Sequence, residues 1–146
     1  MDYRYAPAKA ARPRRIIVID DESYLTTVVA TKLRQAGYSV STAANGEEGF
    51  ALAAAGDPPD LIITDFEMPV LSGFDMSVRL KNHRTTANVP LLMLTARAHS
   101  FTPAQLAQTN IRAVCPKPFS ARELVEKVQG LLGEGKSAID AEVSCR

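Results

Sequence analysis

One ten-residue stretch, Asp60 to Pro69 (DLIITDFEMP), places a carboxylate directly after a buried strand. Residues 61–63 are an unbroken apolar run, which is typical of a strand covered on both faces in a parallel sheet. Asp65 follows that run, and a charge there is costly unless a cation, a hydrogen-bond donor or a reactant meets it. Because open α/β sheets bind ligands at the carboxyl ends of their strands, we predict that Asp65 performs the chemistry.

Short apolar runs alternate with amphipathic stretches along the whole chain. The runs predict strands at residues 16–19, 38–43, 61–63, 89–94 and 111–115. The amphipathic stretches predict helices that begin near residues 23, 47, 73, 103 and 121. Five β/α repeats with short connections predict a doubly wound, five-stranded parallel α/β sheet with the flavodoxin-like strand order 2-1-3-4-5.

The helix near residue 73 is predicted against its local pattern. Phe74, Met76, Val78 and Leu80 alternate with polar residues, as in a strand. We nevertheless expect a helix, because parallel strands on either side need a crossover element between them.

Capping residues predict several helix ends. Thr102 precedes Pro103 and is a predicted N-cap, and Ser120 opens a capping box with a glutamate three residues later. Gly37 and Asn110 are predicted to end their helices in the left-handed conformation.

Composition is that of a single intracellular domain. With 46% hydrophobic residues, the chain suits one domain over residues 15–133, between a flexible basic arm (1–14) and a flexible tail (134–146). A net charge of +1 argues against a nucleic-acid partner. No stretch approaches the roughly 20 apolar residues of a membrane span. Cys115 and Cys145 form no disulfide framework, so a cytoplasmic location is predicted.

Polar side chains follow four of the predicted strands. These residues are Asp20 and Asp21, Asp65, Thr95 and Lys117. The strand order brings the acid pair next to Asp65, and three close carboxylates require a compensating charge. Mg²⁺ is the natural cation, with Mn²⁺ expected to substitute. A lysine and a hydroxyl nearby would suit a phosphoryl group on Asp65, so phosphoryl transfer onto this carboxylate is predicted.

Competing interpretations exist for each residue. Asp20 or Asp21 could cap a helix, Thr95 could bond the backbone, and Lys117 could be a solvated surface cation. The chain has no GxxxxGK[ST] or GxGxxG loop, so nothing indicates a bound nucleotide.

Four segments carry a family resemblance when they are taken together and in order. They are IIVIDDE (16–22), LIITDFEMPVLSG (61–73), LLMLTAR (91–97) and PKPF (116–119). Over about residues 14–133, the chain resembles the receiver domain of two-component response regulators.

This resemblance implies a phosphorelay role. Asp65 would accept a phosphoryl group from a phosphohistidine on a sensor histidine kinase or a phosphotransfer protein. Lys117 would contact the phosphoryl oxygen, Thr95 would close onto it, and the Lys117–Pro118 bond is expected to be cis. The implied Mg²⁺ ligands are the side chains of Asp20, Asp21 and Asp65 and the backbone carbonyl of Glu67.

One departure concerns how the signal would leave the site. The family commonly has an aromatic residue three positions before the lysine, whereas this chain has Val114. Thr95 and the segment from Ala96 to Phe101 would then carry the change, with Phe101 as a substitute ring or as simple packing. The side chain of Glu67 is expected to overlook the site and to alter the lifetime of the aspartyl phosphate.

Three functions stay open from sequence alone. The first is a stand-alone response regulator that signals by changing its binding to an unknown output protein, without substrate turnover. The second is a receiver-like docking domain that is never phosphorylated. The third is a phosphatase of the haloacid dehalogenase kind, although the DxDx[TV] pattern of such enzymes is absent around Asp65. The resemblance implies output through the last two helices and the fifth strand, and a weak homodimer through that face is compatible with the sequence.

Overall fold

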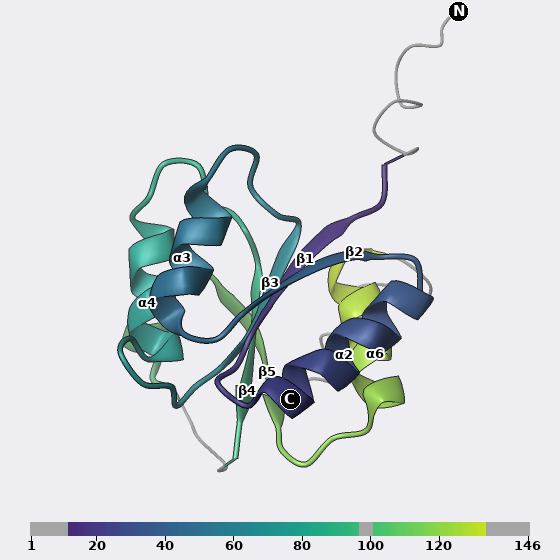
Figure 1. The fold of residues 1–146 in the computed structure, drawn as a ribbon. Coiled ribbons are helices and arrows are strands. Elements are labelled where there is room, and N and C mark those ends of the chain that lie inside the picture. Colours follow the sequence, from purple (N-terminus) through teal and green to yellow (C-terminus); the bar gives the residue numbers. More distant parts are fainter. Residues whose placement is uncertain (1–11, 97–100, 134–146) are drawn as a thin grey trace, which may run out of the picture.

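A five-stranded parallel sheet forms the centre of the molecule (Figure 1). The computed structural model describes residues 12–96 and 101–133. The strand order is β2-β1-β3-β4-β5, and every neighbouring pair is parallel, as predicted. The strands are β1 (Arg15–Ile19), β2 (Ser39–Ala43), β3 (Leu61–Asp65), β4 (Leu91–Thr95) and β5 (Ile111–Pro116).

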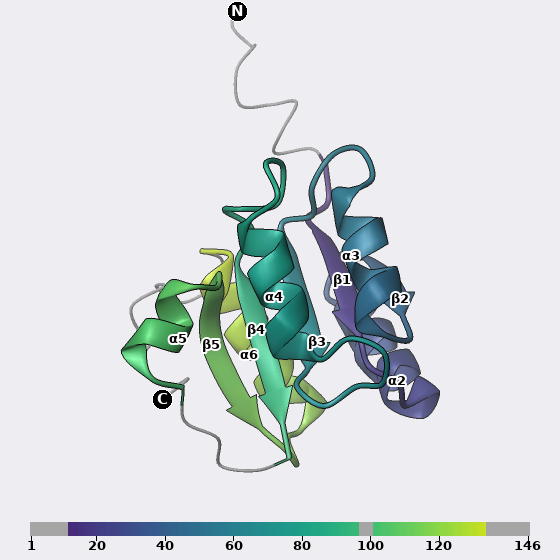
Figure 2. The ribbon, with the colours of Figure 1, turned by 90° about the vertical axis from the view of Figure 1, so that its left-hand side faces the viewer.

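Helices cover the sheet on both faces. On one face lie α2 (Ser23–Gln35) and α6 (Ala121–Leu131), and on the other lie α3 (Gly46–Ala54) and α4 (Gly73–Lys81) (Figure 1). The short helix α5 (Pro103–Ala107) lies beside β5 (Figure 2). This is the doubly wound arrangement that the alternation of strands and helices predicted.

Two hydrophobic clusters, one on each face of the sheet, form the core. Every residue of β3 and β4 is buried, which explains why both strands are almost entirely apolar. Alternate residues of β1 belong to opposite clusters, with Ile16 and Val18 in one and Ile17 and Ile19 in the other. The sheet therefore holds the ends of its strands rigidly at one edge.

Helix α4 is a helix despite its alternating sequence. Its buried residues are Gly73, Met76, Ser77 and Leu80, which are spaced three and four apart as on one helical face. The strand-like alternation arises because Phe74 and Val78 are only partly buried beside that face. Topology therefore predicted this element correctly where local pattern did not.

The predicted N-caps are confirmed, but one predicted helix end is wrong. Thr102 and Ser120 both form capping boxes, and Gly37 has a φ of 104°. Asn110, however, is not a left-handed terminator, because α5 ends at Ala107 and Asn110 is buried. Its side-chain amide donates hydrogen bonds to the backbone carbonyls of Thr86 and Val89. Asn110 is therefore a buried polar side chain whose amide nitrogen is satisfied by backbone carbonyls of two other residues.

Other element bounds differ from the predictions by one or two residues, as with β4, which begins at Leu91 rather than at Val89. Several parts of the sequence lie outside the described residues. They are most of the predicted arm, the predicted tail, His99, Cys145 and most of the segment between Ala96 and Phe101. Within the described ranges, no helix combines the length and the apolar character that crossing a bilayer requires.

Candidate functional site

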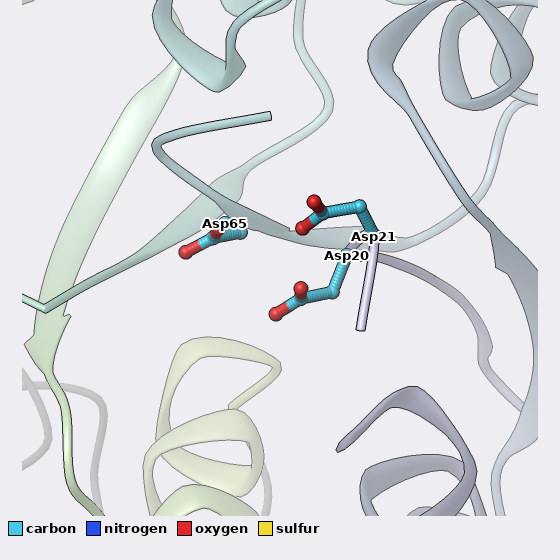
Figure 3. Close-up of side chains that lie close together, drawn as sticks. All are labelled: Asp20, Asp21 and Asp65. Atoms are coloured by element: carbon cyan, nitrogen blue, oxygen red, sulfur yellow. The ribbon is translucent and has the colours of Figure 1, made fainter. Parts of the chain in front are cut away.

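Three carboxylates converge at the carboxyl edge of the sheet. Asp20 and Asp21 follow β1, and Asp65 is the last residue of the adjacent strand β3. One carboxylate oxygen from each of the three lies within 4.8 Å of the others (Figure 3). Asp20 and Asp65 are buried, whereas Asp21 is exposed at the rim. The parallel pairing of β1 with β3 therefore produces the acidic cluster that the sequence predicted.

Lys117 reaches this cluster from the end of β5. Its Nζ lies 3.1 Å from Oδ1 of Asp65 and 3.3 Å from Oδ2 of Asp20. The Lys117 side chain is only 19% exposed, so it is not a freely solvated cation. A single ammonium group thus lies between two buried carboxylates.

Asp20 is held by the backbone rather than serving as a helix cap. Its Oδ1 accepts a hydrogen bond from the backbone N–H of Glu22 at 3.0 Å. The N-cap of α2 is Glu22, which makes no side-chain capping bond. Neither Asp20 nor Asp21 is the N-cap, so the capping interpretation of this acid pair is wrong.

The electrostatic environment opposes ionisation of the two buried acids. Burial raises the pKa of Asp20 above its ordinary value, although the N–H of Glu22 and the charge of Lys117 lower it in part. Burial likewise raises the pKa of Asp65, a hydrogen bond from Lys117 opposes this, and the charge of Asp20 adds to it.

The pKa of Lys117 moves in the direction that retains its proton. Burial alone would lower this pKa, but hydrogen bonding to Asp65 and the negative charges of Asp20 and Asp65 raise it above the ordinary value. Lys117 therefore stays a cation, while the pocket still carries more acids than bases.

Thr95 ends β4 at the same edge of the sheet and is 4% exposed. Its backbone carbonyl accepts a hydrogen bond of 2.7 Å from the backbone N–H of Lys117. The two residues are thereby tied together across neighbouring strands. The Lys117–Pro118 peptide bond that follows is cis, as expected.

The loop from β3 to α4 leaves the site at Asp65 and leads to Gly73, a residue whose role at the site the sequence did not predict. The N–H of Gly73 donates to the carbonyl of Phe66 at 2.9 Å. A Cβ on Gly73 would lie 2.2 Å from the backbone oxygen of Asp65, a distance that no side chain tolerates. Only glycine allows α4 to start against the backbone of Asp65. The sequence predicts a helix start near Gly73 but does not indicate this close approach.

Four residues that were predicted to modulate the site lie outside the acidic cluster. Glu67 is exposed on the β3–α4 loop, and Ala96 is exposed after β4. Val114 is partly buried on β5. Phe101 is also partly buried, and its ring packs on the rings of Phe66 and Phe74, two partners that the sequence did not predict.

The donor set fits a divalent cation. Three carboxylates face one ammonium group, so the pocket retains net negative charge when all four groups are ionised. Carboxylate oxygens are hard ligands of the kind that Mg²⁺ takes in one or two positions while it keeps several waters. The exposed position of Asp21 leaves one side of the cluster open to solvent.

Comparison with known proteins agrees with this geometry. A family model described as the response regulator receiver domain matches residues 16–129. The phosphate regulon transcriptional regulatory protein PhoB of Pseudomonas aeruginosa is 33% identical over 133 residues, which cover 89% of this chain and 58% of PhoB. The chain therefore spans little more than half the length of that relative.

Solved structures match over most of the fold. Chemotaxis response regulator CheY4 of Vibrio cholerae has a TM-score of 0.74 and 29% identity, covering 81% of this chain and 98% of that one. The receiver domain of sensor histidine kinase PA1611 from P. aeruginosa was solved with magnesium coordinated in its active site cleft. It has a TM-score of 0.73 and 27% identity, covering 84% of this chain and 100% of that one. The family model, the strand order and the acids at the strand ends agree, and the chain belongs to the response regulator receiver domain family.

Proposed function

We propose that Asp65 is the phosphoacceptor of this chain and that its donor is a phosphohistidine on a sensor histidine kinase or a phosphotransfer protein. The observation that carries the proposal is the ion pair between Asp65 and Lys117 at the open end of a buried strand. A buried carboxylate with one cation and two further acids around it is poised for a reaction at that carboxylate rather than for a structural role.

The transfer needs few groups from the protein. A carboxylate oxygen of Asp65 attacks phosphorus, the bond from phosphorus to the donor imidazole nitrogen breaks, and that nitrogen keeps the bonding electron pair. Lys117 lies 3.1 Å from Asp65 and would donate to an oxygen of the arriving phosphoryl group. Thr95, tied to Lys117 through the backbone, would supply a hydroxyl donor.

Mg²⁺ would be held by the side chains of Asp20, Asp21 and Asp65 and by the backbone carbonyl of Glu67. The metal supplies neutralising charge for the phosphoryl oxygens. Mn²⁺ has the same preference for oxygen ligands and is expected to substitute.

The phosphorylated domain would act by changing its binding to an output protein, not by turning over a substrate. Transfer and self-catalysed dephosphorylation would be the only chemistry that it performs. We place this activity in the cytoplasm, because the two cysteines of the chain, Cys115 and Cys145, are too few for a disulfide framework.

The proposal is tested by incubating the chain with acetyl phosphate and Mg²⁺ and measuring its intact mass. The wild-type chain should gain one phosphoryl group, and Asp65→Asn should gain none. Asp75→Asn is the matched control, because Asp75 is an exposed acid in the first turn of α4. Continuous release of phosphate would indicate a hydrolase, and a wild-type chain that never gains mass would indicate a docking domain. Either result would overturn the proposal.

A further inference from the structure

Helix α5 has no buried residue of its own, whereas residues near both of its ends are buried or partly buried. None of its residues, Pro103–Ala107, is buried. After its C-terminal end, Thr109 and Asn110 are buried just before β5, and the side chain of Asn110 donates to the carbonyl of Thr86. At its near end, Phe101 is a partly buried aromatic residue directly before the N-cap Thr102. Phe101 is therefore the packed side chain that adjoins the N-terminal end of α5.

The ring of Phe101 lies between two other rings. It stacks on Phe74, with centroids 5.8 Å apart and an interplanar angle of 11°. It also meets the ring of Phe66 edge-on, with centroids 5.8 Å apart and an angle of 65°. Both geometries are favourable for aromatic pairs, so the contacts are specific as well as apolar.

Both partners of Phe101 are attached to the phosphoacceptor. Phe66 is the next residue after Asp65, and its carbonyl accepts from the N–H of Gly73. Phe74 follows Gly73, whose backbone touches the backbone oxygen of Asp65. Asp65 is therefore connected to the ring of Phe66 through the chain and to the ring of Phe74 through Gly73.

Val114 does not offer an equivalent link. Its side chain is partly buried on β5 and carries no ring that could exchange between two packed positions. The coupling element has to lie elsewhere if the site communicates with this side of the fold.

We propose that Phe101 is the residue that couples the state of Asp65 to the position of α5, through its ring contacts with Phe66 and Phe74. The inference rests on the proposed function, because it assumes that Asp65 is phosphorylated. The coupling role is thereby assigned to Phe101, which precedes α5, because β5 carries no aromatic residue.

Hydrogen exchange at the α5 amides tests the inference. The backbone N–H groups of Leu106, Gln108 and Thr109 are bonded within this segment and report on its order. Exchange is measured with and without Mg²⁺ and beryllofluoride, a mimic of the acyl phosphate, in wild type, Phe101→Ala and Val114→Ala. Fluorine NMR of the bound beryllofluoride shows separately whether the Asp65 site is loaded.

Wild type should bind beryllofluoride and change its exchange at α5. Phe101→Ala should still bind the mimic, but its α5 amides should exchange about fivefold faster without ligand, equivalent to about 1 kcal/mol, and should lose the ligand-dependent change. Val114→Ala should keep that change. Should Phe101→Ala fail to fold, Phe101→Leu keeps apolar volume without a ring and should retain less than half of the change.

Other results overturn the inference. If Phe101→Ala shows the full ligand-dependent change in exchange, the ring has no coupling role. Phe101→Leu decides this point if Phe101→Ala does not fold. If Val114→Ala loses the change, the coupling role belongs to β5. Wild type that binds beryllofluoride with no change at α5 overturns the inference but leaves the proposed function standing. Wild type that binds none overturns both.

Discussion

The ammonium nitrogen of Lys117 lies 3.1 Å from Oδ1 of Asp65, although Asp65 ends β3, Lys117 follows β5, and β4 lies between these two strands. The long lysine side chain bridges that separation and also reaches Asp20. Lys117 compensates for only part of the negative charge, because three carboxylates share the pocket. The remaining imbalance makes the stability of the metal-free fold dependent on pH.

Replacing Asp65 with asparagine should stabilise the metal-free fold at neutral pH. Burial raises the folded-state pKa of Asp65 above its unfolded value, so its ionisation opposes folding. A group of this kind favours the fold at low pH, and that contribution is lost as the pH rises through the folded-state pKa. Urea unfolding should show Asp65→Asn more stable than wild type at pH 7, with a difference that shrinks toward about pH 4.

The control for the pH prediction is Asp75→Asn, which removes an exposed acid. Its stability relative to wild type should change little over the same pH range. A stability difference for Asp65→Asn that is constant with pH would contradict the prediction.

Mg²⁺ should stabilise the folded chain, because it offsets the charge of the three acids. At a free metal concentration of about 100 times the dissociation constant, the gain should be about 2.7 kcal/mol in the free energy of unfolding. Asp20→Asn and Asp21→Asn each replace one carboxylate of the cluster by a neutral amide and should lose most of that gain. Urea unfolding with and without metal measures the difference. The same metal-induced gain in Asp21→Asn as in wild type would count against a shared site.

Gly73→Ala should destabilise the fold and disturb Asp65 together. The added Cβ would lie 2.2 Å from the backbone oxygen of Asp65 and 3.1 Å from Sδ of Met93. Such overpacking costs about 1–3 kcal/mol and is relieved only by moving backbone. We expect a lower unfolding midpoint and slower phosphoryl acceptance from acetyl phosphate.

Gly37→Ala is the matched control for Gly73→Ala. Gly37 has a φ of 104° but open space where a Cβ would be, so alanine there costs about 1–2 kcal/mol of backbone strain alone. Its phosphorylation rate should equal that of wild type. Equal phosphorylation rates in both glycine variants would show that the close approach of Gly73 to Asp65 is only structural.

Glu67→Ala should lengthen the lifetime of the aspartyl phosphate. Glu67 is exposed on the loop that leaves Asp65, where its carboxylate can orient a water molecule that attacks phosphorus. Dephosphorylation should slow severalfold while stability stays within about 0.5 kcal/mol, as for other surface substitutions. Glu126→Ala, an exposed acid on α6, is the control, and equal rates in wild type and Glu67→Ala would refute the idea.

Sequence reasoning reached the fold because the apolar runs are short, unbroken and regularly spaced. Residues buried on both faces of a parallel sheet are apolar throughout, so 61–63 and 91–94 could be read as strands without further information. Prediction from the sequence failed where a side chain forms hydrogen bonds with a distant part of the chain. Asn110 is the example, since its amide serves two buried carbonyls instead of ending a helix.

By itself, the sequence determined the sheet and the residues at its carboxyl edge, because in a parallel sheet a residue that follows a strand always lies at that edge. Asp20, Asp21, Asp65, Thr95 and Lys117 could all be named in this way. Only the tertiary structure decided the contacts between them and around them. Examples are the bridge from Lys117 to two acids, the approach of Gly73 to Asp65 and the ring contacts of Phe101. Such contacts depend on side-chain reach and helix placement, which no local pattern encodes.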